Sequence, residues 1–252
     1  TIRSNTLGSA NILESTRINK IKNLVYITSD KCYLNVEKTN GYDEKDTLGG
    51  YDNYSSSKAA AEILFNSYHH SFFKSKFLRH ASARAGNVIG GGDMKKNRVI
   101  PDVVKALKAG NKIFLRNPNS TRPWQHVLEP LFGYLKLGSY LITKKLKNLD
   151  HPNWNFGPKE KNCVRVIEIV RKIKKIWPKK NIKILKTKKQ KFKESKLLSL
   201  KIKKAQKELQ WKPRLTLNET INLTTDWYIS YYNKKNMINL TKSQIKYFLE
   251  KK

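Results

Sequence analysis

Cysteines, acidic residues and long apolar runs are all scarce in this chain of 252 residues. The two cysteines, Cys32 and Cys163, lie far apart without CxxC spacing or histidine-rich surroundings, which argues against a disulfide framework and a zinc site. No apolar run approaches the roughly 18 to 20 residues of a membrane span, and the N-terminus lacks the basic-then-apolar order of a signal peptide. We therefore expect a cytoplasmic protein that binds neither a membrane nor a metal ion.

The shortage of acidic residues leaves a strongly basic chain. There are 19 acidic residues against 52 basic ones, and the formal net charge is +33. This makes nucleic acid the first partner to consider. However, 42 of the basic residues are lysines, and in the most basic stretch, 171–212, they alternate with isoleucine and leucine. A nucleic-acid footprint usually interleaves its charge with stacking aromatics or arginine forks. We therefore favour a solvated surface and keep an RNA footprint as the alternative.

The spacing of apolar residues predicts an α/β fold. Helices are expected at about 4–19, 55–73, 99–109, 130–146, 164–176, 200–209, 217–232 and 241–252. Strands are expected at 23–28, 77–83, 112–116 and 181–185, with a further strand end at 154–157. The run 23–28 is rich in β-branched residues and is typical of a buried parallel strand. Functional side chains in such sheets lie at the carboxyl ends of the strands, here from Ser29 onward.

A phenol and an amine stand together at the start of the second expected helix. Tyr54 and Lys58 are at positions i and i+4, so they lie on one helical face. An ammonium group favours the phenolate and would lower the pKa of Tyr54 from about 10 toward neutrality, which makes it a usable base. This pair alone is weak evidence, because a lysine-rich chain can produce it by chance. The preceding strand end strengthens it, since Ser29, Asp30 and Lys31 supply a hydroxyl, a carboxylate and a second amine.

Four blocks of sequence resemble the extended short-chain dehydrogenase/reductases that modify nucleotide sugars, and more narrowly the CDP-glucose 4,6-dehydratases. They are TSDKCY (28–33), GGYDNYSSSK (49–58), ASARAGNVIGGGD (81–93) and RNPNSTRPWQHVLEP (116–130), and the match continues through WNFGP (154–158) and LQWKPR (209–214). The resemblance implies part of a Rossmann-like, doubly wound parallel sheet with a smaller α/β substrate-binding domain. We expect residues 1–90 in the NAD-binding domain and residues 91–252 mainly in the substrate domain, intertwined with the first.

The resemblance also implies a reaction, the conversion of CDP-glucose to CDP-4-keto-6-deoxyglucose with NAD as cofactor. Tyr54 would take the proton of the 4-hydroxyl while hydride passes from C4 to NAD, and Lys58 would hold the nicotinamide ribose. Ser29 would bond the sugar oxygen. Asp30 and Lys31 would act as acid and base in the elimination of water across C5 and C6, before hydride returns to C6. A nucleotide-sugar epimerase and an inactive basic remnant are the alternatives.

Further residues are expected to bind rather than react. Arg84 would contact the cofactor, while Asn87, Arg98, Arg122 and His126 would contact the nucleotide sugar. Arginine forks suit phosphate geometry. For His126, a packed structural histidine is an equally good interpretation. The glycines at 90–92 lack GxGxxG spacing, and we interpret them as a turn beside the sugar site.

One family feature is missing from the sequence, the N-terminal glycine-rich turn GxxGxxG that receives the NAD pyrophosphate. By comparison with the family, roughly a hundred N-terminal residues are absent, so we expect two strands of the sheet, 23–28 and 77–83, with the first as an exposed edge. We also expect the chain alone to bind NAD poorly and to turn over little CDP-glucose. A homo-oligomer formed through the helices at 4–19 and 55–73 is expected.

Overall fold

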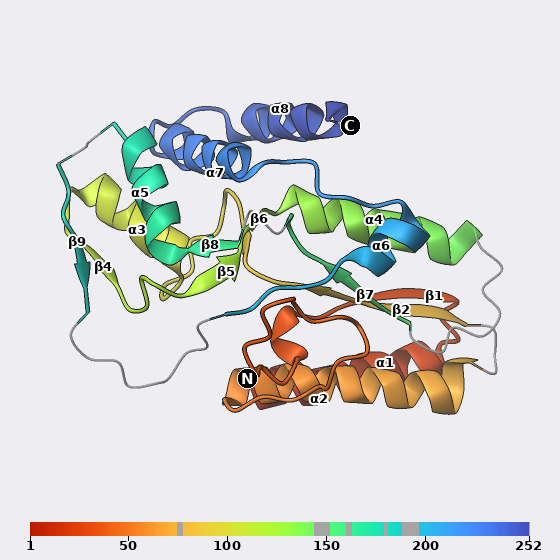
Figure 1. Cartoon of the computed structure of the whole chain (residues 1–252). Helices are drawn as coiled ribbons and strands as arrows, with labels where there is room; N and C mark the ends of the chain where they lie inside the picture. Colours follow the sequence, from red (N-terminus) through yellow and green to blue (C-terminus); the bar gives the residue numbers. More distant parts are fainter. Residues whose placement is uncertain (75–77, 144–151, 160–162, 179–180, 188–196, 252) are drawn as a thin grey trace. The chain divides into compact units, whose positions relative to one another are not determined.

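The computed structural model describes two compact units of α/β structure (Figure 1). The described residues are 1–74, 78–143, 152–159, 163–178, 181–187 and 197–251. The first unit comprises Thr1–Gly86, Pro130–Gly157 and Leu198–Lys212, and the second comprises Asn87–Glu129, Pro158–Leu197 and Pro213–Lys252. The chain leaves the first unit near the expected boundary at residue 90. It returns twice, because later segments supply a strand and two helices to that unit.

A three-stranded parallel sheet forms the centre of unit 1. Its order is β1 (Asn23–Ile27), β2 (Arg79–Ala85) and β7 (Asn153–Phe156), so β2 is central and β1 lies at an edge. The expectation of two strands was therefore wrong, because β7 pairs with β2 from Ser82 to Ala85. All four residues of β7 are buried, and its asparagines are accommodated because their side chains bond to other buried polar groups.

Helices cover both faces of this sheet (Figure 1). On one face lie α1 (Gly8–Ile18) and α2 (Asn53–Tyr68), each continued by one wider, π-type turn, and on the other lie α4 (Leu128–Thr143) and α6 (Lys203–Leu209). Residues 144–146 of the expected fourth helix lie outside the described residues. A Cβ at Gly133 would lie 2.4 Å from the Phe156 ring, so this glycine lets α4 approach β7 closely. The layered arrangement confirms the α/β fold class predicted from the sequence.

Unit 2 packs its helices around a separate apolar core. The helices around it are α3 (Val99–Ala109), α5 (Val166–Ile176) and α7 (Leu217–Tyr232), and α8 (Met237–Glu250) packs on α7. Three short strand pairs accompany them: β3 (Val88–Ile89) with β6 (Gln125–His126), β4 (Ile113–Leu115) with β9 (Ile184–Lys186), and β5 (Thr121–Pro123) with β8 (Cys163–Arg165). The core is formed by side chains such as Val103, Leu107, Ile169, Ile173, Ile221 and Tyr228.

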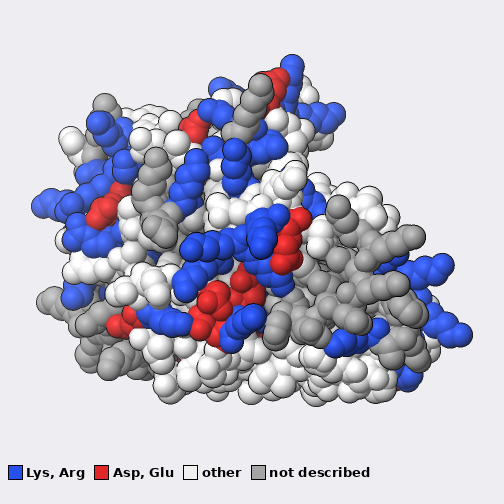
Figure 2. Space-filling view, turned by 45° about the vertical axis from the view of Figure 1, so that its right-hand side comes forward, with Lys and Arg blue, Asp and Glu red and all other residues white. Residues whose placement is uncertain are grey.

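Basic side chains are spread over the face shown in Figure 2, with acidic ones in smaller groups. Part of the most basic stretch lies outside the described residues, but α5 shows how its charge is placed. Its Arg171, Lys172 and Lys175 are exposed, while the opposite face buries Val166, Ile169, Val170 and Ile173. This is the pattern of a solvated amphipathic helix. No helix in the described part of the chain is long and apolar enough to span a membrane.

Candidate functional site

The first part of the site is a tight turn at the carboxyl end of β1. Thr28 and Ser29 follow the strand, and a single 3-10 turn, η2 (Asp30–Cys32), comes next. The Ser29 hydroxyl caps this turn, since its Oγ accepts from the Lys31 backbone N–H at 3.3 Å and donates to Asp30 Oδ1 at 3.1 Å. Asp30 is 2% exposed, whereas Lys31 is only partly buried. The turn packs against α2, which carries the second part of the site.

The start of α2 is fixed by Asp52, which the sequence analysis missed. Its carboxylate accepts from the backbone N–H groups of Tyr54 and Ser55 at 2.9 and 3.0 Å, as an N-cap does. Burial opposes ionisation of Asp52, but these hydrogen bonds and the nearby Lys31 lower its pKa. An aspartate two residues before Tyr54 is a typical N-cap, so the sequence contained the signal for the start of this helix. The cap places Tyr54 in the first helical turn, where it is 46% exposed.

Lys58 lies one turn further along α2 and is half-buried. Burial lowers the pKa of its amine, while the neighbouring Cys32 and Glu62 act in the opposite direction. Since Cys32 belongs to η2, these electrostatic contacts place Lys58 beside the Ser29–Lys31 turn. The structure therefore places the five residues that the sequence analysis proposed for chemistry on two segments that pack together: Ser29, Asp30 and Lys31 at the η2 turn, and Tyr54 and Lys58 on α2.

Two residues that the sequence analysis did not single out surround Asp30. Gly86 directly follows β2, and a Cβ there would lie 1.7 Å from Asp30 Oδ2. Only glycine at position 86 leaves room for the Asp30 carboxylate in its observed position. Tyr134 of α4 is the second neighbour, and burial together with the Asp30 charge raises its pKa to about 12. The Tyr134 phenol therefore stays protonated at neutral pH.

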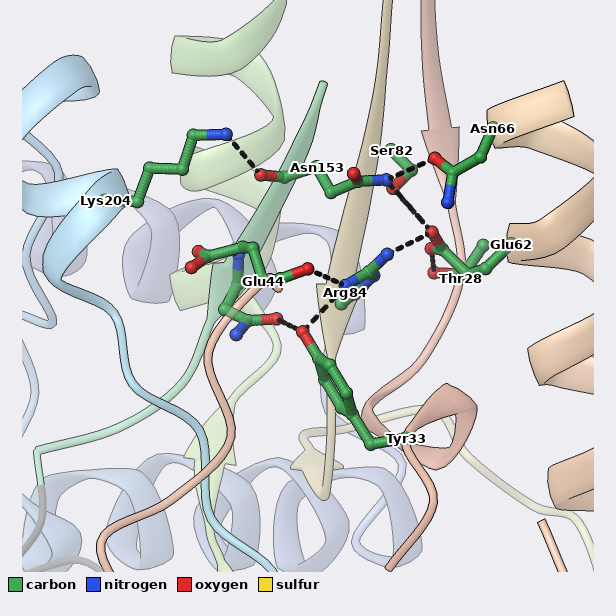
Figure 3. A network of polar contacts seen from close by, with 10 residues as sticks. Thr28, Tyr33, Glu44, Glu62, Asn66, Ser82, Arg84, Asn153 and Lys204 are labelled. Atoms are coloured by element: carbon green, nitrogen blue, oxygen red, sulfur yellow. Dashed lines mark hydrogen bonds and ion pairs between the residues drawn. The ribbon is translucent and has the colours of Figure 1, made fainter. Parts of the chain in front are cut away.

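Arg84, the expected cofactor contact, occupies a different environment. It is 1% exposed, and its guanidinium bonds Glu62 Oε2 at 2.6 Å, the Tyr33 hydroxyl at 2.8 Å and the Glu44 carbonyl at 3.1 Å (Figure 3). Burial would lower the pKa of Arg84, but the adjacent Glu62 carboxylate raises it well above its usual value. The side chain is thus committed to partners inside unit 1. Arg84 lies in a block that matches the family, but its partners Tyr33, Glu44 and Glu62 come from other segments and cannot be inferred from that block.

The residues expected to bind the nucleotide sugar lie in unit 2, in different surroundings. Asn87 and Arg122 line one cavity of about 120 Å³, together with Phe114, Arg116, Asn117 and Trp124 among others. Arg122 is 4% exposed and donates to the Thr121 carbonyl at 2.9 Å. Arg98 is instead exposed and pairs with Asp93 at 2.9 Å. Hence Asn87 and Arg122 share a cavity, while Arg98 stands on the surface near the start of α3.

His126 and the glycine turn are both packed in the interior of unit 2. His126 is 2% exposed, its Nδ1 accepts from the Leu128 N–H at 3.4 Å, and burial lowers its pKa to about 4. Of the glycines at 90–92, Gly91 lies against α7, where an added Cβ would be 2.0 Å from Trp227 Cγ. Close packing against Trp227 is thus one reason for a glycine in this turn.

Comparison with known proteins identifies the family of this chain. A protein-family model described as GDP-mannose 4,6 dehydratase matches residues 1–224. The chain belongs to the GDP-mannose 4,6-dehydratase family. A curated member of similar sequence, CDP-glucose 4,6-dehydratase from Salmonella typhimurium, is 39% identical over 251 residues. That alignment covers 97% of this chain and 69% of the relative.

Solved structures share the fold of this family member. One is dTDP-glucose 4,6-dehydratase from Bacillus anthracis in complex with NAD, with a TM-score of 0.74 and 22% identity over 93% of this chain and 70% of that one. Another is an epimerase from Methanothermobacter thermautotrophicus, with a TM-score of 0.78 and 19% identity over 96% and 68%. At these identities the likeness concerns the fold, and it confirms the Rossmann-like α/β architecture.

The burial of His126 predicts sensitivity to acid. Its pKa is about 4 when folded and 6.5 ordinarily, so the folded protein takes up this proton less readily than the unfolded chain. The resulting stability is present above pH 6.5 and is lost as the pH falls toward 4. Between pH 7 and pH 4.5, we expect the parent to lose about 2 kcal/mol more unfolding free energy than His126→Gln, measured by urea denaturation.

The exposed His70 provides the control for this measurement. His70→Gln should lose as much stability in acid as the parent does. Equal acid sensitivity of His126→Gln and the parent would contradict the burial of a neutral ring at position 126.

Proposed function

We propose that this chain carries the catalytic and substrate-binding residues of an NAD-dependent nucleotide-sugar 4,6-dehydratase that acts on CDP-glucose. One observation carries the proposal: the Ser29–Lys31 turn lies against α2 beside Lys58, in a chain that is 39% identical to a CDP-glucose 4,6-dehydratase. A hydroxyl, a carboxylate, a phenol and two amines are the groups that an oxidation followed by an elimination requires.

Tyr54 and Lys58 fit the nicotinamide end of the cofactor. Within the described part of the chain, the half-buried Lys58 amine makes no hydrogen bond or ion pair, so its donors are available to ribose hydroxyls. Tyr54 presents its exposed phenol from the preceding turn of the same helix. The cofactor held by these two residues would supply the acceptor for the C4 hydride and its return to C6.

The residues of the chain move the protons of this reaction. Tyr54 takes the proton of the 4-hydroxyl, and the positive charge of Lys58 favours the phenolate that does so. The 4-ketone then acidifies the C5 proton. Asp30 and Lys31 divide the elimination between them: one removes the C5 proton, and the other donates a proton to the C6 hydroxyl as the C6–O bond breaks and water leaves. The Ser29 hydroxyl bonds the sugar oxygen.

The cavity of about 120 Å³ lined by Asn87 and Arg122 is the proposed site of the diphosphate part of the substrate. The buried Arg122 guanidinium provides charge in a place where water screens it little. We expect CDP-glucose to bind the chain and Arg122→Ala to weaken binding about tenfold or more, measured by isothermal titration calorimetry. Arg171→Ala, which removes an exposed arginine of α5, is the matched control and should leave the affinity unchanged. Equal loss in both variants would contradict this assignment.

Isotope labelling tests the reaction itself. CDP-glucose that carries deuterium at C4 should yield a product lighter by one water with the deuterium at C6, because hydride leaves and returns within one active site. Mass spectrometry and NMR locate the label, and its position rather than the rate is the readout. Tyr54→Phe should lower turnover by about 100-fold or more but leave CDP-glucose affinity nearly unchanged. A product that retains the deuterium at C4 would exclude the dehydratase reaction.

We also propose that the protein forms a homodimer through α1 and α2. Both helices expose large apolar side chains, with Ile12 and Ile18 on α1 and Ile63 on α2 each more than half exposed. Ile63→Lys should convert the dimer to a monomer in sedimentation experiments. Ile142→Lys, which changes an equally exposed isoleucine on α4, is the control and should remain dimeric. A monomeric parent would refute the proposal.

A further inference from the structure

Glu62 is a fully buried carboxylate that the proposed reaction does not use. It lies on α2, is 0% exposed, and accepts hydrogen bonds from β2, from β7 and from the residue that directly follows β1 (Figure 3). Its Oε1 accepts from the Thr28 hydroxyl at the end of β1. Its Oε2 accepts from Ser82 at 3.0 Å and Arg84 at 2.6 Å, both on β2, and from Asn153 of β7 at 3.1 Å.

These partners lie next to the proposed catalytic residues along the chain. Thr28 directly precedes Ser29, which begins the Ser29–Lys31 turn. On α2, Glu62 follows Lys58 by four residues, or about 6 Å along the helix axis, and Tyr54 by eight residues, or about 12 Å. The Glu62 carboxylate thus connects the end of β1, which leads into the Ser29–Lys31 turn, to α2, which carries Tyr54 and Lys58.

Resting on the proposed function, we infer that Glu62 is a positioning residue for the dehydratase reaction. Its carboxylate fixes the position of α2 along the helix axis relative to the strands of the sheet. This position sets the distance between the Tyr54–Lys58 pair and the Ser29–Lys31 turn. Apolar contacts on α2, such as those of Phe65, tolerate small shifts. Hydrogen bonds to the planar Glu62 carboxylate, from β2, β7 and the residue after β1, do not tolerate such shifts, because their lengths and angles are restricted.

The ion pair with Arg84 adds to this constraint. Both side chains are almost fully buried, at 1% exposure for Arg84 and none for Glu62, so neither can exchange its partner for water. Arg84 is itself bonded to Tyr33 and to the Glu44 carbonyl, which hold it from the other side. Glu62 therefore has one position in which all of its donors are satisfied.

Glu62→Asp is the sharpest test because it keeps the charge that Arg84 requires while shortening the side chain by one methylene. The aspartate can reach the strand donors only if α2 shifts or some hydrogen bonds are lost. Phe65→Leu is the matched control, since it weakens the core on the same helix without touching the carboxylate. Its side chain is 0% exposed and packs with Leu13 and Phe73.

The first readout needs neither substrate nor cofactor. Amide hydrogen exchange is followed by mass spectrometry in peptides that cover 28–34 and 53–60. In Glu62→Asp, we expect exchange to rise about tenfold in both peptides beyond what its global unfolding free energy explains. In Phe65→Leu, exchange in these peptides should follow global stability. If the two variants behave alike once corrected for stability, Glu62 only stabilises the fold and the inference is wrong.

A second readout is the reactivity of Lys58. Glu62→Gln removes the carboxylate that favours the charged amine, so acetylation of Lys58 at neutral pH should be at least about twofold faster relative to the exposed Lys172. If this variant does not fold, Glu62→Asp still decides the matter by hydrogen exchange. Unchanged Lys58 reactivity in folded Glu62→Gln would contradict a link between the carboxylate and the catalytic amine.

The third readout joins the inference to the reaction. Glu62→Asp should lower kcat about 10- to 100-fold while KM changes less than about twofold, because misplaced catalytic groups affect the chemical step more than binding. Phe65→Leu should leave both constants near those of the parent. Because the chain alone is expected to turn over slowly, these assays use saturating NAD and long incubation. If the parent then forms no dehydrated product at all, the proposed function fails, and hydrogen exchange and Lys58 labelling still decide whether Glu62 holds the two segments together.

Discussion

A carboxylate without access to water must be surrounded by hydrogen-bond donors. Glu62 in unit 1 is such a carboxylate, since it is 0% exposed. Its donors come from Thr28, Ser82, Arg84 and Asn153, so the strand order β1-β2-β7 and the position of α2 meet at one polar centre. The apolar layers on either face of the sheet supply the driving force for folding. The polar centre selects one arrangement of those layers, because any other would leave a buried charge or amide unpaired.

Local signals explain why some elements were predicted to the residue. The helix at 99–109 ends where Gly110 adopts a left-handed conformation with φ of 73°, which glycine adopts at little cost. The helix at 217–232 begins with a capping box in which Thr216 and Glu219 bond each other's backbone N–H groups. Both boundaries depend on side chains within a few residues of the helix end, so the sequence contains the whole signal.

The strand end expected at 154–157 is present as β7, but its pairing with β2 and its polar contacts depend on distant partners and were not visible in the same way. The short segment β7 carries asparagines at positions 153 and 155, which are poor strand formers, and it is buried because Glu62, Ser82 and the Tyr42 carbonyl complete their hydrogen bonds. Arg84 resembled a cofactor contact because it lies in a family block, yet its partners come from segments 22 to 51 residues away. The motif residues from Ser29 to Lys58 lie on η2 and the first turns of α2, which pack together, because the carboxyl end of a parallel strand and the start of the following helix meet by topology.

Two half-buried lysines of unit 1, Lys58 and Lys204, differ in the partners of their amines. Burial lowers the pKa of both Lys58 and Lys204. Lys204 donates to the Asn153 carbonyl at 2.9 Å and lies 4.0 Å above the centre of the Trp154 ring, so the fold already uses its charge. Lys58 has no such bond within the described part of the chain, and it stands where a strand end, a capped helix and an exposed phenol converge. In a chain with 42 lysines, the lysine that we propose for chemistry is therefore distinguished by its half-buried position beside η2 combined with unused donors.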